Sequence, residues 1–140
     1  MKSILPLLAV GFLWFISFLH MYWAFGGRWS SAAVLPVREG EHKPAFTPRI
    51  WGTLFVACLI LLASIIIVVQ GNYLQSFRAN SLSKIGSIVC AIIFIIRAIG
   101  DFNYVGFFKK IKHSQFARYD TWIYSPLCLF FGFVYIILLF

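Results

Sequence analysis

At 140 residues the chain has the length of one domain (1–140), and 61% of its residues are hydrophobic whereas only 11% are charged. Soluble domains have roughly 45–50% apolar and about 25% charged residues. Because a chain this short cannot bury its excess of apolar residues, part of that excess must face lipid. The net charge of +8 does not indicate nucleic-acid binding, because the basic residues fall between apolar runs, where they set topology and contact anionic head groups. We therefore expect an integral membrane protein whose partner is the lipid bilayer.

The three cysteines, Cys58, Cys90 and Cys128, each lie inside an apolar run, without a CxxC motif or a histidine at ligand spacing. This pattern argues against a thiol–disulfide carrier and against a structural zinc site. Bis-histidine haem needs two intramembrane histidines, and only His20 lies in an apolar run. We predict neither a metal nor a cofactor.

The first apolar run predicts a membrane-spanning helix over residues 4–25. It is long enough to cross a bilayer, and it ends in bulky aromatic residues rather than in the small residues of a signal-peptide cleavage site. His20 and Trp23 share one face near its end, which we expect to point into the bundle. His20 has two interpretations: a neutral histidine bonded to a neighbouring helix, or a functional group.

A proline-rich loop over 26–49 separates this span from the second, predicted over 48–70. Its charged run, 38–43, is interpreted as a solvated turn, with a mobile lid as the alternative. Thr47 and Pro48 predict an N-cap and a first helical residue. The aliphatic centre of the second span favours a scaffold role.

The third span is predicted over 84–105, capped by Ser81 or Ser83. Arg97 and Asp101 are four residues apart, so a helix would place them on one face. An ionisable pair inside a bilayer is costly and is a functional-site hypothesis by default.

The fourth span has two candidate starts. Asp120 would cap a helix over 121–140 that is kinked before Pro126, whereas Ser125 would cap one of about 15 residues, or roughly 22 Å. The second is short for a hydrocarbon core of about 30 Å, so we predict the kinked helix.

Four spans predict an all-α membrane protein, an up-down bundle with both termini on the same side. Three basic residues (Lys2, Arg78 and Lys84) accompany the N-terminus and second loop, against eight in the first and third loops. Positive residues favour the cytoplasm, so we expect a multi-pass cell-membrane protein with its termini outside. The eight are Arg28, Arg38, Lys43, Arg49, Lys109, Lys110, Lys112 and Arg118.

This topology predicts a polar cluster near the cytoplasmic ends of the first, third and fourth helices. We expect His20, Arg97 and one of Asp101 or Asp120 to line a single pocket open to that side. The full candidate set is His20, Trp23, Arg97, Asp101, Tyr104, Asp120 and Ser125.

Three functions fit such a cluster. In a structural role, Arg97 pairs with an aspartate and fastens the bundle. In a binding role, Arg97 holds the anionic group of a lipid or small amphiphile between Trp23 and Tyr104. In an enzyme or carrier, His20 works as an acid or base with Asp101 or Asp120.

Three blocks of sequence carry a family resemblance: residues 20–27 (HMYWAFGG), 97–109 (RAIGDFNYVGFFK) and 116–129 (FARYDTWIYSPLCL). They resemble an uncharacterised family of small bacterial four-helix membrane proteins, a domain of unknown function. The resemblance implies a bacterial cytoplasmic-membrane location and supplies no activity.

Overall fold

The computed structural model describes residues 4–29, 31–36, 40, 44 and 47–140, and all its regular elements there are helices. Three long helices are α1 (Ile4–Ala24), α3 (Ile50–Gln70) and α4 (Ser81–Ile99). The fourth is continuous over Gln115–Ile137 and consists of α5 (Gln115–Tyr119), the π-helical segment η1 (Asp120–Tyr124) and α6 (Ser125–Ile137). A short helix, α2 (Ser31–Val34), lies between α1 and α3.

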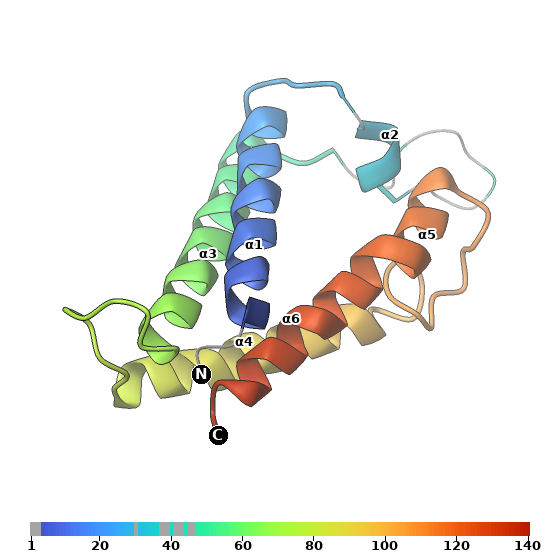
Figure 1. The fold of residues 1–140 in the computed structure, drawn as a ribbon. Helices are drawn as coiled ribbons and strands as arrows, with labels where there is room; N and C mark the ends of the chain where they lie inside the picture. Colours follow the sequence, from blue (N-terminus) through green and yellow to red (C-terminus); the bar gives the residue numbers. More distant parts are fainter. Residues whose placement is uncertain (1–3, 30, 37–39, 41–43, 45–46) are drawn as a thin grey trace.

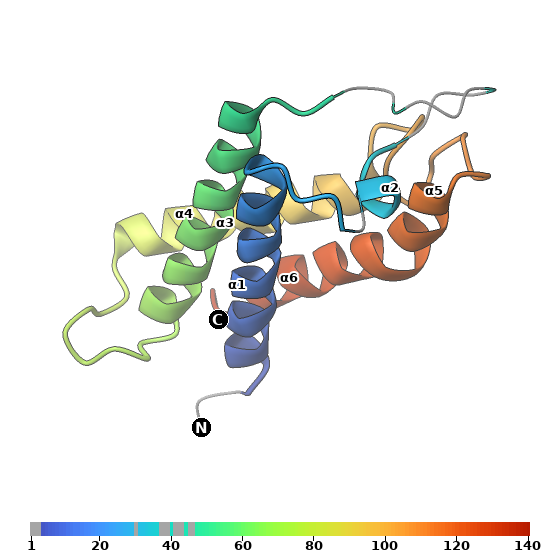
Figure 2. The same cartoon turned by 90° about the horizontal axis from the view of Figure 1, so that it is seen from above.

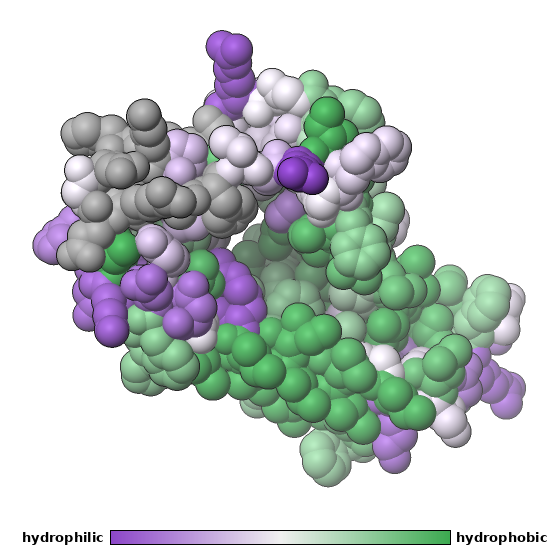
Figure 3. All heavy atoms as spheres, turned by 180° about the vertical axis from the view of Figure 1, so that it is seen from behind, coloured by the Kyte–Doolittle hydropathy of each residue, from purple (hydrophilic) through white to green (hydrophobic). Residues whose placement is uncertain are grey.

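All four long helices have the length and apolar composition to cross a membrane. The prediction of an all-helical membrane protein is confirmed, and the chain is a multi-pass membrane protein. Viewed from behind, hydrophobic side chains cover the middle of the molecule and hydrophilic ones gather towards its ends (Figure 3). This is the distribution that a bilayer requires of an exposed protein surface.

The long helices form two pairs. α1 packs mainly against α3, and α4 packs mainly against α6, with fewer contacts between the pairs. Figure 1 shows α4 running at a steep angle to α1 and α3, and Figure 2 shows the same two pairs from above. The start of α1 and the C-terminus lie near each other in both views.

Small residues and interhelical hydrogen bonds hold the pairs together. Ser17 on α1 is buried and donates its hydroxyl proton to the carbonyl of Ala57 on α3 at 2.9 Å. The Tyr135 hydroxyl on α6 donates to the carbonyl of Ala63 on α3 at 2.6 Å, which ties the two pairs together. Lipid tails are as apolar as leucine, so close packing and polar contacts replace the hydrophobic effect as the force between helices.

The structure corrects two predicted helix starts. α3 begins at Ile50, with Arg49 in extended conformation at its N-cap, so Thr47 and Pro48 lie outside the helix. α4 is capped by Asn80, whose side chain accepts the N–H of Ser83 while the Ser83 hydroxyl accepts the N–H of Asn80. Ser83 therefore takes part in a capping box without being the cap itself.

The third span ends six residues before the predicted position 105. Its last helical residue is Ile99, because Gly100 adopts φ +87° and ψ −169°, a conformation restricted almost entirely to glycine. Asp101 therefore lies beyond the helix, and the expected pairing of Arg97 and Asp101 on one helical face does not occur.

The fourth span starts earlier than predicted. Ser114 caps it by accepting the N–H of Ala117 at 3.0 Å, and the helix continues through Asp120 and past Pro126. Asp120 is consequently an interior helical residue rather than a cap. The sequence predicted that the fourth helix starts after Asp120 and kinks before Pro126. The structure instead has a π-helical turn over Asp120–Tyr124 within a continuous helix.

Candidate functional site

Asp120 is the centre of the polar contacts at the α4–α6 end of the molecule. The residue is fully buried. Its Oδ1 accepts a hydrogen bond from Arg97 Nη2 at 3.1 Å, and its Oδ2 accepts one from Lys109 Nζ at 3.0 Å and one from the Gly106 N–H at 2.7 Å. We call Arg97, Lys109 and Asp120 the ionic cluster.

Asp120 is the first residue of the π-helical segment. A π turn inserts one residue into an α-helix, shifts the faces that follow and is frequent at functional sites. Here the turn runs from Asp120 to Tyr124, and the N–H of Ser125 bonds to the Asp120 carbonyl. The chain thereby presents Asp120 and buried Ser125 from neighbouring turns of one helix.

The loop between α4 and α5 brings Lys109 to the carboxylate. Gly100 and Gly106 both have positive φ, and a Cβ on either would collide with the backbone beside the other. The N–H of Phe107 bonds to the carbonyl of Ala98 at 2.9 Å. The chain therefore folds back on the end of α4, which places Lys109 beside Asp120.

Lys109 is buried, with 1% of its side chain exposed. Its ammonium donates to Asp120 Oδ2, to the Gly106 carbonyl at 2.8 Å and to Thr121 Oγ1 at 2.6 Å, so all three of its protons are engaged. Neither Lys109 nor Thr121 belongs to the predicted candidate set, and Lys109 enters the predictions only as one of the basic residues of the third loop. No helical spacing links Lys109 to Asp120, so no periodic signal could have revealed the pair.

Arg97 differs from Lys109 because one of its hydrogen-bond donors has no acceptor among the described residues. Its side chain is 34% exposed, and Nη1, although buried, has no hydrogen-bond partner among the described residues. Arg97 also lies in the last turn of α4, where the negative end of the helix dipole favours a cation.

Asp101 stabilises the loop and has no contact with Arg97 among the described residues. Its Oδ1 accepts the N–H groups of Asn103, Tyr104 and Val105 at 3.0, 2.8 and 2.9 Å. Desolvation would raise the pKa of the Asp101 carboxyl, but these backbone hydrogen bonds outweigh it and lower that pKa. The residue itself is exposed.

His20 and Trp23 contact each other at the end of α1. The Nδ1 of His20 bonds to the Ile16 carbonyl of its own helix at 2.8 Å, an arrangement that needs a proton on Nδ1. The imidazole meets the Trp23 ring edge-on, with 5.4 Å between centroids. Trp23 donates its indole N–H to the Trp29 carbonyl at 2.9 Å. Within the described part of the chain, neither residue hydrogen-bonds to the ionic cluster.

Two further residues of the predicted site are close in sequence to members of the ionic cluster. Tyr104 is half-buried in the α4–α5 loop, where its N–H bonds to Asp101. Ser125 is fully buried, and its hydroxyl oxygen has no hydrogen-bond partner among the described residues. Nowhere in that part of the chain do three or more His, Cys, Asp or Glu residues gather as metal ligands would.

The fold and the site define a four-span membrane protein with a buried ionic cluster at one end of its second helix pair. The chain belongs to the family described as protein of unknown function (DUF3995), which matches residues 13–135. This confirms membership of an uncharacterised family, and the match includes every residue of the ionic cluster. Neither the curated proteins nor the solved structures contain a match.

Proposed function

We propose that this protein binds the anionic head group of a membrane lipid or small amphiphile at Arg97. The observation that carries the proposal is the charge of the ionic cluster, in which Arg97 and Lys109 share the single carboxylate of Asp120. Two cations and one anion leave one positive charge. An uncompensated charge at partial membrane depth is costly, and an anionic ligand would remove that cost.

The distribution of hydrogen bonds identifies Arg97 as the surplus cation. Lys109 and Asp120 form a neutral pair in which each ammonium proton has an acceptor. Arg97 shares Asp120 through Nη2 alone, and its Nη1 is unpartnered among the described residues. If the cluster served only to fasten the helices, the Lys109–Asp120 pair would suffice.

The chemistry of the guanidinium indicates the class of ligand. Its planar, forked donors match the oxygens of a phosphate or carboxylate, often through two parallel bonds. The Arg97 side chain is partly exposed as a whole, although its unpartnered Nη1 is buried. Ser125, one π turn from Asp120, supplies a buried hydroxyl without a partner among the described residues. These features support a phosphate- or carboxylate-bearing ligand.

An acid–base function of His20 has less support. The ring is bonded to the carbonyl of Ile16 and packed on Trp23. Within the described residues it has no carboxylate partner of the kind that orients a catalytic histidine.

Native mass spectrometry of the purified protein tests the proposal. We expect anionic phospholipid or amphiphile to remain bound to the wild type and to be lost from Arg97→Ala. Arg97→Lys, which keeps the charge without the fork, should retain less than the wild type. Arg78→Ala is the matched control, because Arg78 is exposed in the loop before α4.

The result that would refute the proposal is equal anionic adduct on the wild type and on Arg97→Ala. Arg97→Lys is the control for misfolding, because it keeps a positive charge opposite Asp120. A folded Arg97→Lys protein with unchanged adducts would also count against guanidinium recognition.

A further inference from the structure

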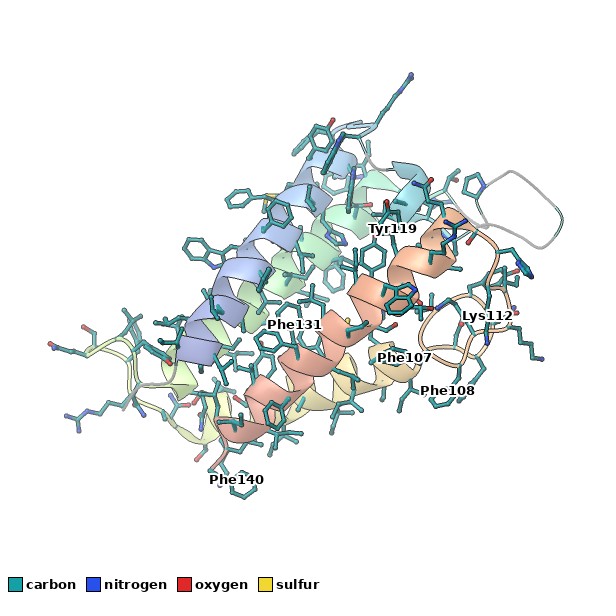
Figure 4. All side chains as sticks on the ribbon, turned by 45° about the vertical axis from the view of Figure 1, so that its right-hand side comes forward. Phe107, Phe108, Lys112, Tyr119, Phe131 and Phe140 are labelled. Carbon is teal, nitrogen blue, oxygen red and sulfur yellow. The ribbon has the colours of Figure 1, made fainter. Side chains whose placement is uncertain are left out.

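The loop between α4 and α5 (residues 100–114) exposes large aromatic side chains next to lysines. Phe102 and Phe108 are 57% and 64% exposed, with their ring centroids 6.3 Å apart. Lys110 and Lys112 are exposed as well. Figure 4 shows Phe107, Phe108 and Lys112 extending from this loop, at the end of the molecule remote from Phe140.

Hydrogen bonds fix this loop in its conformation. Asp101 accepts three successive backbone N–H groups, and Asp120 accepts that of Gly106. The N–H of Ile111 bonds to the carbonyl of Asn103 at 3.1 Å, so the two halves of the loop are joined. The exposure of the phenylalanines is therefore a property of an ordered loop, and it would be unfavourable in water.

Buried and exposed side chains alternate over residues 108–110 of the loop. Lys109 turns inward to Asp120, whereas its neighbours Phe108 and Lys110 are exposed. The loop begins directly after α4, a helix suited to crossing the bilayer, so it lies where the membrane meets water. Aromatic rings and lysines are the side chains favoured at this boundary, and lysines there are attracted to anionic lipids.

We propose that the 100–114 loop docks on an anionic lipid surface, with Phe102 and Phe108 among the head groups and Lys110 and Lys112 against phosphates. Charge complementarity favours an anionic lipid surface as the partner of this loop. The only exposed carboxylate in the loop is that of Asp101, which accepts hydrogen bonds from the backbone. The contact goes beyond binding of one head group at Arg97, because it uses other residues and many lipids at once.

The first test compares thermal stability in nanodiscs of phosphatidylcholine alone and of phosphatidylcholine mixed with phosphatidylglycerol. Each lysine near an anionic surface strengthens association about fivefold. The wild type should therefore melt at a higher temperature with phosphatidylglycerol, and Lys110→Gln/Lys112→Gln should lose most of that gain. Arg78→Gln/Lys84→Gln, which removes the same charge near the other end of α4, is the matched control and should keep it.

High salt should reduce the gain of the wild type, because it screens exposed charges. A gain that is equal in the wild type and the Lys110→Gln/Lys112→Gln variant would overturn the proposal, as would an equal loss in the control. Lipid retention at Arg97 is measured separately, so either proposal can fail while the other stands.

The second test places the loop relative to the head groups. A polarity-sensitive dye is attached to Phe108→Cys in a protein whose three native cysteines are replaced by alanine, and the labelled protein is placed in the same nanodiscs. The emission should shift to shorter wavelength and be quenched by lipids that carry a nitroxide on the head group. Emission typical of water, without quenching, would show that the loop stays off the membrane or meets another partner, and would refute the proposal.

Discussion

Asp120 compensates two cations, and no other described carboxylate reaches the ionic cluster. Replacement by asparagine keeps the shape of the side chain but leaves Arg97 and Lys109 without a counter-charge. Breaking a buried ion pair by removing one partner costs about 3–5 kcal/mol. We expect Asp120→Asn to lower the free energy of unfolding by this amount, measured by denaturant titration in detergent.

A double-mutant cycle distinguishes the two aspartates. Arg97→Leu combined with Asp120→Asn should lose less stability than the sum of the single changes, because each removes the other's partner. Arg97→Leu combined with Asp101→Asn should be additive, since Asp101 bonds to the loop backbone. Zero coupling between Arg97 and Asp120 would contradict the geometry described here.

The Asp101 carboxyl makes the loop sensitive to acid. Its pKa in the folded protein is below the ordinary value of 3.8, so the ionised form is the one that the loop stabilises. This contribution is complete above pH 3.8 and is lost as the pH falls through the folded pKa. Hydrogen-exchange protection of the Asn103, Tyr104 and Val105 amides should fall accordingly in the wild type.

Asp101→Asn is the control for this measurement, because a neutral amide does not titrate in this range while Asp120 is retained. Protection in the variant should have a weaker dependence on pH. The same acid-induced loss in both proteins would show that the Asp101 carboxyl does not cause it.

At the scale of single residues, the sequence was informative where a charge interrupted an apolar run. Arg97 is a candidate on that ground, and Asp120 is a candidate as a helix cap and a possible partner of Arg97; the structure joins the two residues. Lys109 and the Asp101 turn depend on loop geometry that no periodicity encodes. His20 was selected for its chemistry, but its partners lie on its own helix and in Trp23.

Among the elements, the turn at Gly100 determines where Lys109 lies. Gly100→Ala would place a Cβ against the backbone of Val105 and Gly106 in a backbone region that alanine avoids. We expect a loss of about 1–3 kcal/mol and weaker exchange protection around Lys109. Gly11→Ala is the matched control: nothing lies within 4 Å of that Cβ, and the change should be neutral or stabilising by about 0.5–1 kcal/mol.

Hydropathy identified all four spans because a bilayer demands long apolar helices, and each one is present. The helix ends were less predictable. Pro48 predicts the start of the second span, but α3 begins at Ile50. The apolar residues after Gly100 predict that the third span continues, but the positive φ of Gly100 ends α4 at Ile99. The hydrophobic pattern did not indicate the π turn over Asp120–Tyr124.

For the molecule as a whole, the distribution of basic residues predicts orientation. We propose that the segments over 26–49 and 107–119 face the cytoplasm, because they carry eight basic residues against three in the N-terminus and second loop. Membrane-impermeant thiol reagents should label Glu41→Cys and His113→Cys only after the cytoplasmic side is opened. Labelling of either variant in intact cells would reverse the assignment.

The division into two helix pairs has a consequence for biogenesis. α1 and α3 find most of their contacts in each other, so this hairpin can leave the translocon and pack before the rest of the chain is synthesised. The α4–α6 hairpin then brings Arg97, Lys109 and Asp120 into the membrane together. The contacts among these three residues therefore form within the same inserting unit and do not depend on the earlier hairpin.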